Sequence, residues 1–152
     1  MTYPDINSVE CYLYQGIPFN HSLIENRNIK KIWMETMTTE EIKEYFVKYV
    51  NLQSNALDEG CSKKANQYHK KILNLYHLAK EQNCIKEVFE DFLNNSDEAI
   101  RLWAAGFCLK LCPTLSEKVL INITKSSDPF RSISAQATLE FYKTGQWDKI
   151  VN

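Results

Sequence analysis

The chain has 152 residues, of which 44% are hydrophobic and 24% are charged, which is ordinary for one compact domain with a packed core. Its formal net charge is −1, and 15 of its 18 basic side chains are lysine. This balance disfavours the nucleic-acid-binding class, which needs a strong basic field and is rich in arginine. No run of 18 apolar residues is present, which disfavours a membrane span.

The beginning of the sequence and its cysteines bear on the cellular compartment. The first ten residues lack a basic start followed by an apolar run, so we expect no secretory signal. The five cysteines are an odd number, and most of them have apolar neighbours, as at Cys84, Cys108 and Cys112. They therefore predict reduced thiols rather than disulfides. We expect a cytoplasmic protein.

The first 37 residues differ in pattern from the rest of the chain. Val9, Cys11 and Leu13 alternate with polar residues, which predicts a short strand. Ser22 and Glu25 have the spacing of a capping box, which predicts a helix that ends near residue 33. We interpret this part as an irregular or β-containing segment that packs on a helical core.

Two long helices are predicted next. Thr38 and Glu41 have capping-box spacing before a periodic stretch over 39–59, and Gly60 follows it as a helix-ending residue. A second periodic stretch covers 62–83. The apolar periodicity predicts these inward-facing residues: Ile42, Phe46, Tyr49, Val50, Gln53 and Leu57 on the first helix, and Ala65, Tyr68, Ile72, Leu75 and Ala79 on the second.

Shorter helices follow, predicted over 85–94, 97–112, 115–125 and 129–143, with a last turn near Trp147 and Ile150. The stretch over 97–112 is apolar on nearly every side, which predicts a helix surrounded by others. Thr114 and Glu117 have capping-box spacing, and Asp128 before Pro129 is a typical helix start. The periodicity of the last long helix predicts that its buried face consists of Phe130, Ile133, Ala137 and Phe141.

Two of these short helices share a motif. Asp97 and Arg101 precede small residues, and Asp128 and Arg131 do the same about 30 residues later. Such an internal repeat of helix pairs resembles HEAT-like repeats, in which the aspartates cap the second helices and the arginines tie adjacent turns together. This resemblance implies an all-α fold of stacked helical hairpins, of the α-solenoid type, over 38–152, with 1–37 appended to it in a single globular unit.

Residues 38–143 also resemble a small bacterial family of helical domains of unknown function. The likeness lies in two long helices, the motif from Asp97 to Ala105 and a second helical pair. Members of such families are often encoded near polymorphic or contact-dependent toxins. The resemblance implies an immunity protein that occludes a toxin domain, and it carries no catalytic residues to this chain.

The sequence also offers candidate partner-binding residues. The carboxylates are concentrated at Glu87, Glu90, Asp91, Asp97 and Glu98. One interpretation is a solvated helix surface with Asp97 as a cap; the other is an acidic patch that docks on a basic partner such as a nuclease toxin. The candidate aromatic anchors are Tyr12, Tyr14 and Trp147.

No catalytic, cofactor-binding or metal-binding motif is visible, so we expect a protein partner and no enzyme activity, cofactor, nucleic acid, membrane or small-molecule substrate. The cysteines at 108 and 112 have apolar neighbours, which favours burial over a metal site. Two alternatives stay open. One is a general helical-repeat adaptor or complex subunit. The other is a DNA-repair-type protein that binds nucleic acid through the lysine pairs at 63–64 and 70–71.

Overall fold

The computed structural model of the chain describes residues 37–151. The chain divides into two units after Met37, and the described residues other than Met37 belong to the second unit. This part consists of helices and turns without a strand, which confirms the all-α prediction for the described residues. The strand and helix predicted before residue 37 lie outside them, as do Tyr12 and Tyr14.

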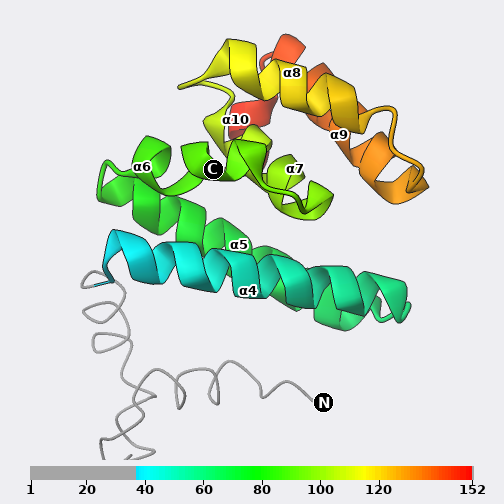
Figure 1. Ribbon diagram of the computed structural model, residues 1–152, viewed down its shortest axis with the longest axis horizontal. Coiled ribbons are helices and arrows are strands. Elements are labelled where there is room, and N and C mark those ends of the chain that lie inside the picture. The colour runs from blue at the N-terminus through cyan, green and yellow to red at the C-terminus, as the bar shows by residue number, and fades with distance from the viewer. Residues whose placement is uncertain (1–36, 152) are drawn as a thin grey trace, which may run out of the picture. The chain divides into compact units, whose positions relative to one another are not determined.

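An antiparallel pair of long helices opens the described part. Helix α4 spans Thr39–Asp58 and helix α5 spans Ser62–Glu81, and the two lie side by side (Figure 1). The capping box is confirmed: Thr38 Oγ1 accepts a hydrogen bond from the Glu41 amide at 3.2 Å, and Glu41 Oε2 accepts one from the Thr38 amide at 3.3 Å. Gly60 follows α4 with a φ of +71°, which a residue with a side chain rarely adopts.

The predicted helix over 85–94 is two short elements. Helix α6 spans Ile85–Phe89, and a 3₁₀ helix, η1, spans Glu90–Asn94. Helix α7 follows over Glu98–Cys108 and ends four residues earlier than predicted. Here the chain turns, and the Cys112 amide donates to the Cys108 carbonyl at 2.7 Å. Pro113 keeps Cys112 out of helical backbone, with φ −133° and ψ 60°, so the helix cannot continue through that residue.

The last three helices are α8 over Pro113–Ile123, α9 over Pro129–Lys143 and α10 over Trp147–Val151. The prediction of a capping box at Thr114 and Glu117 is wrong, because α8 begins one residue before Thr114 and its N-cap, Cys112, makes no side-chain bond to the helix. Proline at the first helical position leaves one amide fewer to satisfy at this end of the helix. The cap at Asp128 is confirmed.

Helix α7 lies between the α4–α5 pair and the α8–α9 pair, and it also contacts α6 and η1 (Figure 1). The core beside it is aromatic. Phe107 of α7 stacks on Tyr76 with a centroid distance of 4.5 Å and contacts Phe89 at 4.9 Å, and Phe89 meets Phe46 edge-on at 5.0 Å. Small residues at the middle of α7, Ala104 to Gly106, are buried as well. The prediction that this helix is surrounded by others is confirmed.

The predicted buried faces are correct for α4 and α5 apart from Leu57, which is 37% exposed. For α9 the prediction is wrong. Phe130 and Ile133 are 57% and 65% exposed, and the buried residues are Ala135 and Thr138. Small side chains on that face let α9 lie close to its neighbours, so its larger apolar residues remain on the outer side.

No helix in the described part of the chain combines the length and hydropathy needed to cross a membrane.

Candidate functional site

The first copy of the repeated motif caps helix α7. Asp97 Oδ1 accepts hydrogen bonds from the amides of Ala99 at 2.8 Å and Ile100 at 3.4 Å. Asn95 Oδ1 accepts the amide of Asp97 at 2.8 Å, which fixes the turn before the cap. The aspartate therefore satisfies amides that the helix itself leaves without a partner.

The second copy repeats this arrangement at the start of α9. Asp128 Oδ1 accepts the amides of Phe130 at 2.9 Å and Arg131 at 3.3 Å. Ser126 Oγ accepts the Asp128 amide at 3.1 Å, as Asn95 does for Asp97. The two turns are therefore built alike, and both aspartates have the capping role that the sequence predicts.

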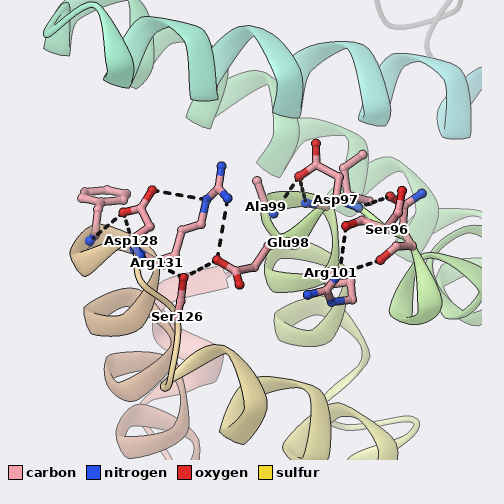
Figure 2. Close-up of polar contacts among 11 residues, drawn as sticks. Ser96, Asp97, Glu98, Ala99, Arg101, Ser126, Asp128 and Arg131 are labelled. Carbon is pink, nitrogen blue, oxygen red and sulfur yellow. Dashed lines mark hydrogen bonds and ion pairs between the residues drawn. The ribbon is translucent and has the colours of Figure 1, made fainter.

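The two arginines differ in what they contact (Figure 2). Arg101 turns back on the loop before its own helix, where Nη1 donates to the carbonyls of Asn95 at 2.7 Å and Ser96 at 3.2 Å. Arg131 instead reaches the neighbouring helix, with Nη1 at 3.6 Å from Glu98 Oε1. Arg101 therefore fixes the turn before its own helix, whereas Arg131 connects α9 to the start of α7.

Glu98 is the centre of this connection. Its Oε1 accepts a hydrogen bond from Ser126 Oγ and faces Arg131, whose Nε lies 3.6 Å from Asp128 Oδ2 (Figure 2). The side chain of Glu98 is 24% exposed, and that of Arg131 is 30% exposed. Glu98 therefore faces α9 and its preceding loop rather than Glu87, Glu90 and Asp91.

Of the remaining predicted carboxylates, Asp91 lies beside α4. Asp91 Oδ2 lies 3.9 Å from Lys43 Nζ, which also lies 3.5 Å from Glu40 Oε1. Glu90 pairs with Lys86 at 4.0 Å on the same short segment, and Glu87 is exposed. We call Glu40, Glu44, Glu87, Glu90 and Asp91, with Lys43 and Lys86, the acidic face.

Charge on the acidic face is unevenly exposed. The carboxylate side chains of Glu40 and Asp91 are 80% and 86% exposed, whereas that of Lys43 between them is 22% exposed. Five carboxylates stand against two ammonium groups, so the formal charge of this set is −3. Around Lys43 the exposed side chains are therefore the negative ones, whereas in the Lys86–Glu90 pair the lysine is the more exposed, at 63% against 41%. A partner that approaches Glu40 and Asp91 meets negative charge first.

Trp147, a predicted partner anchor, makes contacts within the chain. Its Nε1 donates to the Gly106 carbonyl at 2.9 Å. Two further contacts hold the same end of the chain: Asp148 pairs with Lys110, and Nε2 of His77 donates to the Val151 carbonyl at 2.6 Å. The indole is partly buried by this packing, which gives Trp147 a structural role, and its role as a partner anchor stays a prediction.

The buried cysteines are held as thiols. Burial raises the pKa of Cys108 to about 12, and burial also raises the pKa of Cys84. Cys112 Sγ donates to Glu90 Oε1 at 3.8 Å. A nucleophile or metal ligand needs the thiolate form, which this environment disfavours. Among residues 37–151, no group of three or more histidine, cysteine or acidic side chains could hold a metal ion.

Pattern reasoning missed two features of this part of the chain. Glu40 and Glu44 belong to the acidic face, and their helical spacing shows that they share one side of α4, but nothing in the sequence places that side beside Asp91. The second feature is a polar cluster on α7, where Trp103 Nε1 donates to the buried Gln53 Oε1 at 2.9 Å. The one hint of this hydrogen bond in the sequence was Gln53, a polar residue within the apolar stripe of α4.

Comparison of the chain with protein-family models, with curated proteins and with solved structures gives no match.

Proposed function

We propose that this chain is a non-catalytic protein-binding domain of HEAT-like architecture, and that it acts as an immunity protein against a bacterial toxin domain. The acidic face is the observation that carries the proposal. It contains carboxylates of α4, α6 and η1, in which Asp91 of η1 lies 3.9 Å from Lys43 of α4 and the side chains of Glu40 and Asp91 are 80% and 86% exposed. The class of partner is suggested by the sequence resemblance of residues 38–143, through the Asp97–Ala105 motif and the helix order, to helical domains encoded near toxins.

The mechanism is occlusion of a basic toxin surface. A toxin that cuts nucleic acid carries a basic cleft for phosphates, and the carboxylates of Glu87, Glu90 and Asp91 would occupy that cleft in their place. Opposite charge would speed the encounter, and the rigid packing of α6 and η1 on α4 and α7 holds the carboxylates in fixed positions. Binding of this kind neutralises the toxin without any chemical step.

The test begins with capture of the tagged full chain from its native cell, followed by mass spectrometry of the polypeptides that remain bound. The captured partner is then purified, and its affinity is measured for the wild-type chain and for the double variant Glu87→Lys, Asp91→Lys. Both positions are exposed, so the double variant retains the fold. We expect its dissociation constant to rise at least about a hundredfold, and wild-type binding to weaken with added salt.

A matched control reverses charge at a site away from the acidic face. Glu140 is exposed on α9, and Glu140→Lys changes the net charge in the same direction. We expect this variant to bind within about threefold of the wild type. If the double variant and Glu140→Lys weaken partner binding equally, affinity depends on net charge and not on the acidic face. An empty capture would contradict the immunity role, and many weakly bound partners would favour an adaptor instead.

A further inference from the structure

Helix α9 is closed at its end by hydrogen bonds that do not involve α10. The Gly145 amide donates to the Tyr142 carbonyl at 3.2 Å, and the φ of Gly145 is +76°. The Gln146 amide donates to the Phe141 carbonyl at 2.8 Å. Both bonds belong to the typical closing turn of a helix, so this turn can stay intact when α10 moves. Any movement of α10 therefore has its pivot after Gln146.

Hydrogen bonds hold α10 at both of its ends. At the first residue, Trp147 Nε1 donates to the Gly106 carbonyl of α7 at 2.9 Å, and the indole covers that glycine. At the last residue, the Val151 carbonyl accepts a hydrogen bond from His77 of α5 at 2.6 Å. The helix thus connects the end of α9 to two helices that come much earlier in the chain (Figure 1).

An ion pair lies between these two hydrogen bonds. Asp148 pairs with Lys110, and the two side chains are 46% and 59% exposed. Burial raises the pKa of Tyr76, and the charges of Lys110 and Asp148 act on the same hydroxyl in opposite directions. The ion pair therefore lies close to Tyr76 of α5. A pair as exposed as this one adds little to the attachment of α10.

The attachment of α10 is weak beside the packing of the helix that it covers. Helix α10 has five residues, and among them Val151 is buried, whereas Lys149 and Ile150 are exposed. Seven of the eleven residues of α7 are buried. Detaching α10 breaks far fewer contacts than separating α7 from its neighbours, so it requires less free energy.

We propose that α10 is a strap that opens as one unit from α7 and α5 while the other helices of the described part stay packed. Its contacts open together, because a helix of five residues is not stable by itself once one end is detached. The open state uncovers Gly106, which the indole of Trp147 shields in the closed state. The inference is independent of the proposed function, because the acidic face lies on α4, α6 and η1.

Hydrogen exchange of the Trp147 indole measures the opening. It is followed by NMR on the isotope-labelled full chain, and Trp147→Phe assigns the signal. We expect the indole to be at least about tenfold less protected than the backbone amides of Ala105 and Phe107 in α7. Low concentrations of urea should speed exchange at those amides and leave the indole unchanged, because opening the strap exposes little surface. An indole with the same protection and urea dependence as α7 overturns the strap.

A change at one end of α10 tests whether the helix moves as a unit. His77→Ala removes the donor to Val151, at the opposite end from the indole, and should speed exchange of the Trp147 indole at least about threefold. The control is His69→Ala on the same helix, which lies beside Trp103 and should change that rate by less than about twofold. The backbone signals of α7 confirm that both variants are folded. Unchanged indole exchange in His77→Ala overturns movement as a unit, and so does equal acceleration by the two variants.

Discussion

Trp147 Nε1 donates a hydrogen bond to the Gly106 carbonyl at 2.9 Å, and its six-membered ring lies beside the position that a side chain at Gly106 would take. A Cβ at Gly106 would be 3.0 Å from Trp147 Cζ2. The absence of a side chain in the middle of α7 is therefore what lets α10 pack against it. Glycine inside a helix has an energetic cost, so this contact must offset a loss of helix propensity.

We expect Gly106→Ala to destabilise the wild-type chain and to stabilise a Trp147→Ala variant. Alanine gains about 1 kcal/mol in helix propensity, but crowding against the indole costs about 1–3 kcal/mol. In the Trp147→Ala background the crowding is absent, so only the gain in helix propensity remains. Urea unfolding of the four chains, followed by circular dichroism, measures both effects. The same sign of the effect in both backgrounds would show that the indole does not set the requirement for glycine.

The contact between Glu98 and Arg131 should couple the stabilities of α7 and α9. We expect a coupling energy of about 0.5–1 kcal/mol between Glu98→Ala and Arg131→Met, because both side chains are mostly shielded from water and Glu98 also accepts from Ser126. A double-mutant cycle from urea unfolding measures it. Lys86 and Glu90 form a more exposed control pair, at 63% and 41%, and their coupling should be under about 0.5 kcal/mol. Equal coupling in the two pairs would contradict the prediction.

Replacing Ser116 by alanine should stabilise the fold. Its Oγ is fully buried in α8 and has no hydrogen-bond partner among the described residues, so folding removes it from water without compensation. We expect Ser116→Ala to raise the free energy of unfolding by about 1 kcal/mol. The matched control is Ser132→Ala, because Ser132 Oγ donates to the Thr124 carbonyl at 2.6 Å and its removal should lower stability. If Ser116→Ala also lowers stability, the hydroxyl has a partner in solution.

Stability should decrease below neutral pH in part through His69. Burial beside Trp103, whose ring centroid is 4.9 Å away, lowers the pKa of His69 from 6.5. The unfolded chain therefore binds the proton more readily, and this contribution to stability is lost as pH falls below 6.5 towards the folded-state pKa. His69 is an exposed residue that is only partly shielded by Trp103, so the effect is small. Thermal unfolding at pH values of about 7.5 and 5.5 should show a smaller decrease for His69→Gln than for the wild type; an equal decrease would assign it to other groups.

Local chemistry was enough to predict most of the helices. Thr38, Asp97 and Asp128 are caps with side chains that bond the nearest amides, and such signals depend on few neighbours. Features that depend on tertiary packing were not predictable in this way. Periodicity finds the apolar side of α9 correctly, but that side faces outward because Ala135 and Thr138 allow closer contact with the core.

The candidate surface was predicted only in part, for the same reason. Glu87, Glu90 and Asp91 are close in sequence and lie on the consecutive elements α6 and η1, but Glu98 lies beyond a turn and a cap, and it faces α9 instead. Glu40 joins the surface from a helix 50 residues earlier, through Lys43. Contacts between distant segments carry no local signal in a single sequence.

The burial of Cys108 makes its thiol a reporter of local opening around α7. The thiol is fully shielded at the end of α7, and its pKa of about 12 leaves little reactive thiolate at neutral pH. A thiol-modifying reagent can therefore reach it only when α7 separates from its neighbours. The rate of alkylation at Cys108, followed by mass spectrometry against the partly exposed Cys112, would report how often the centre of the molecule opens under native conditions.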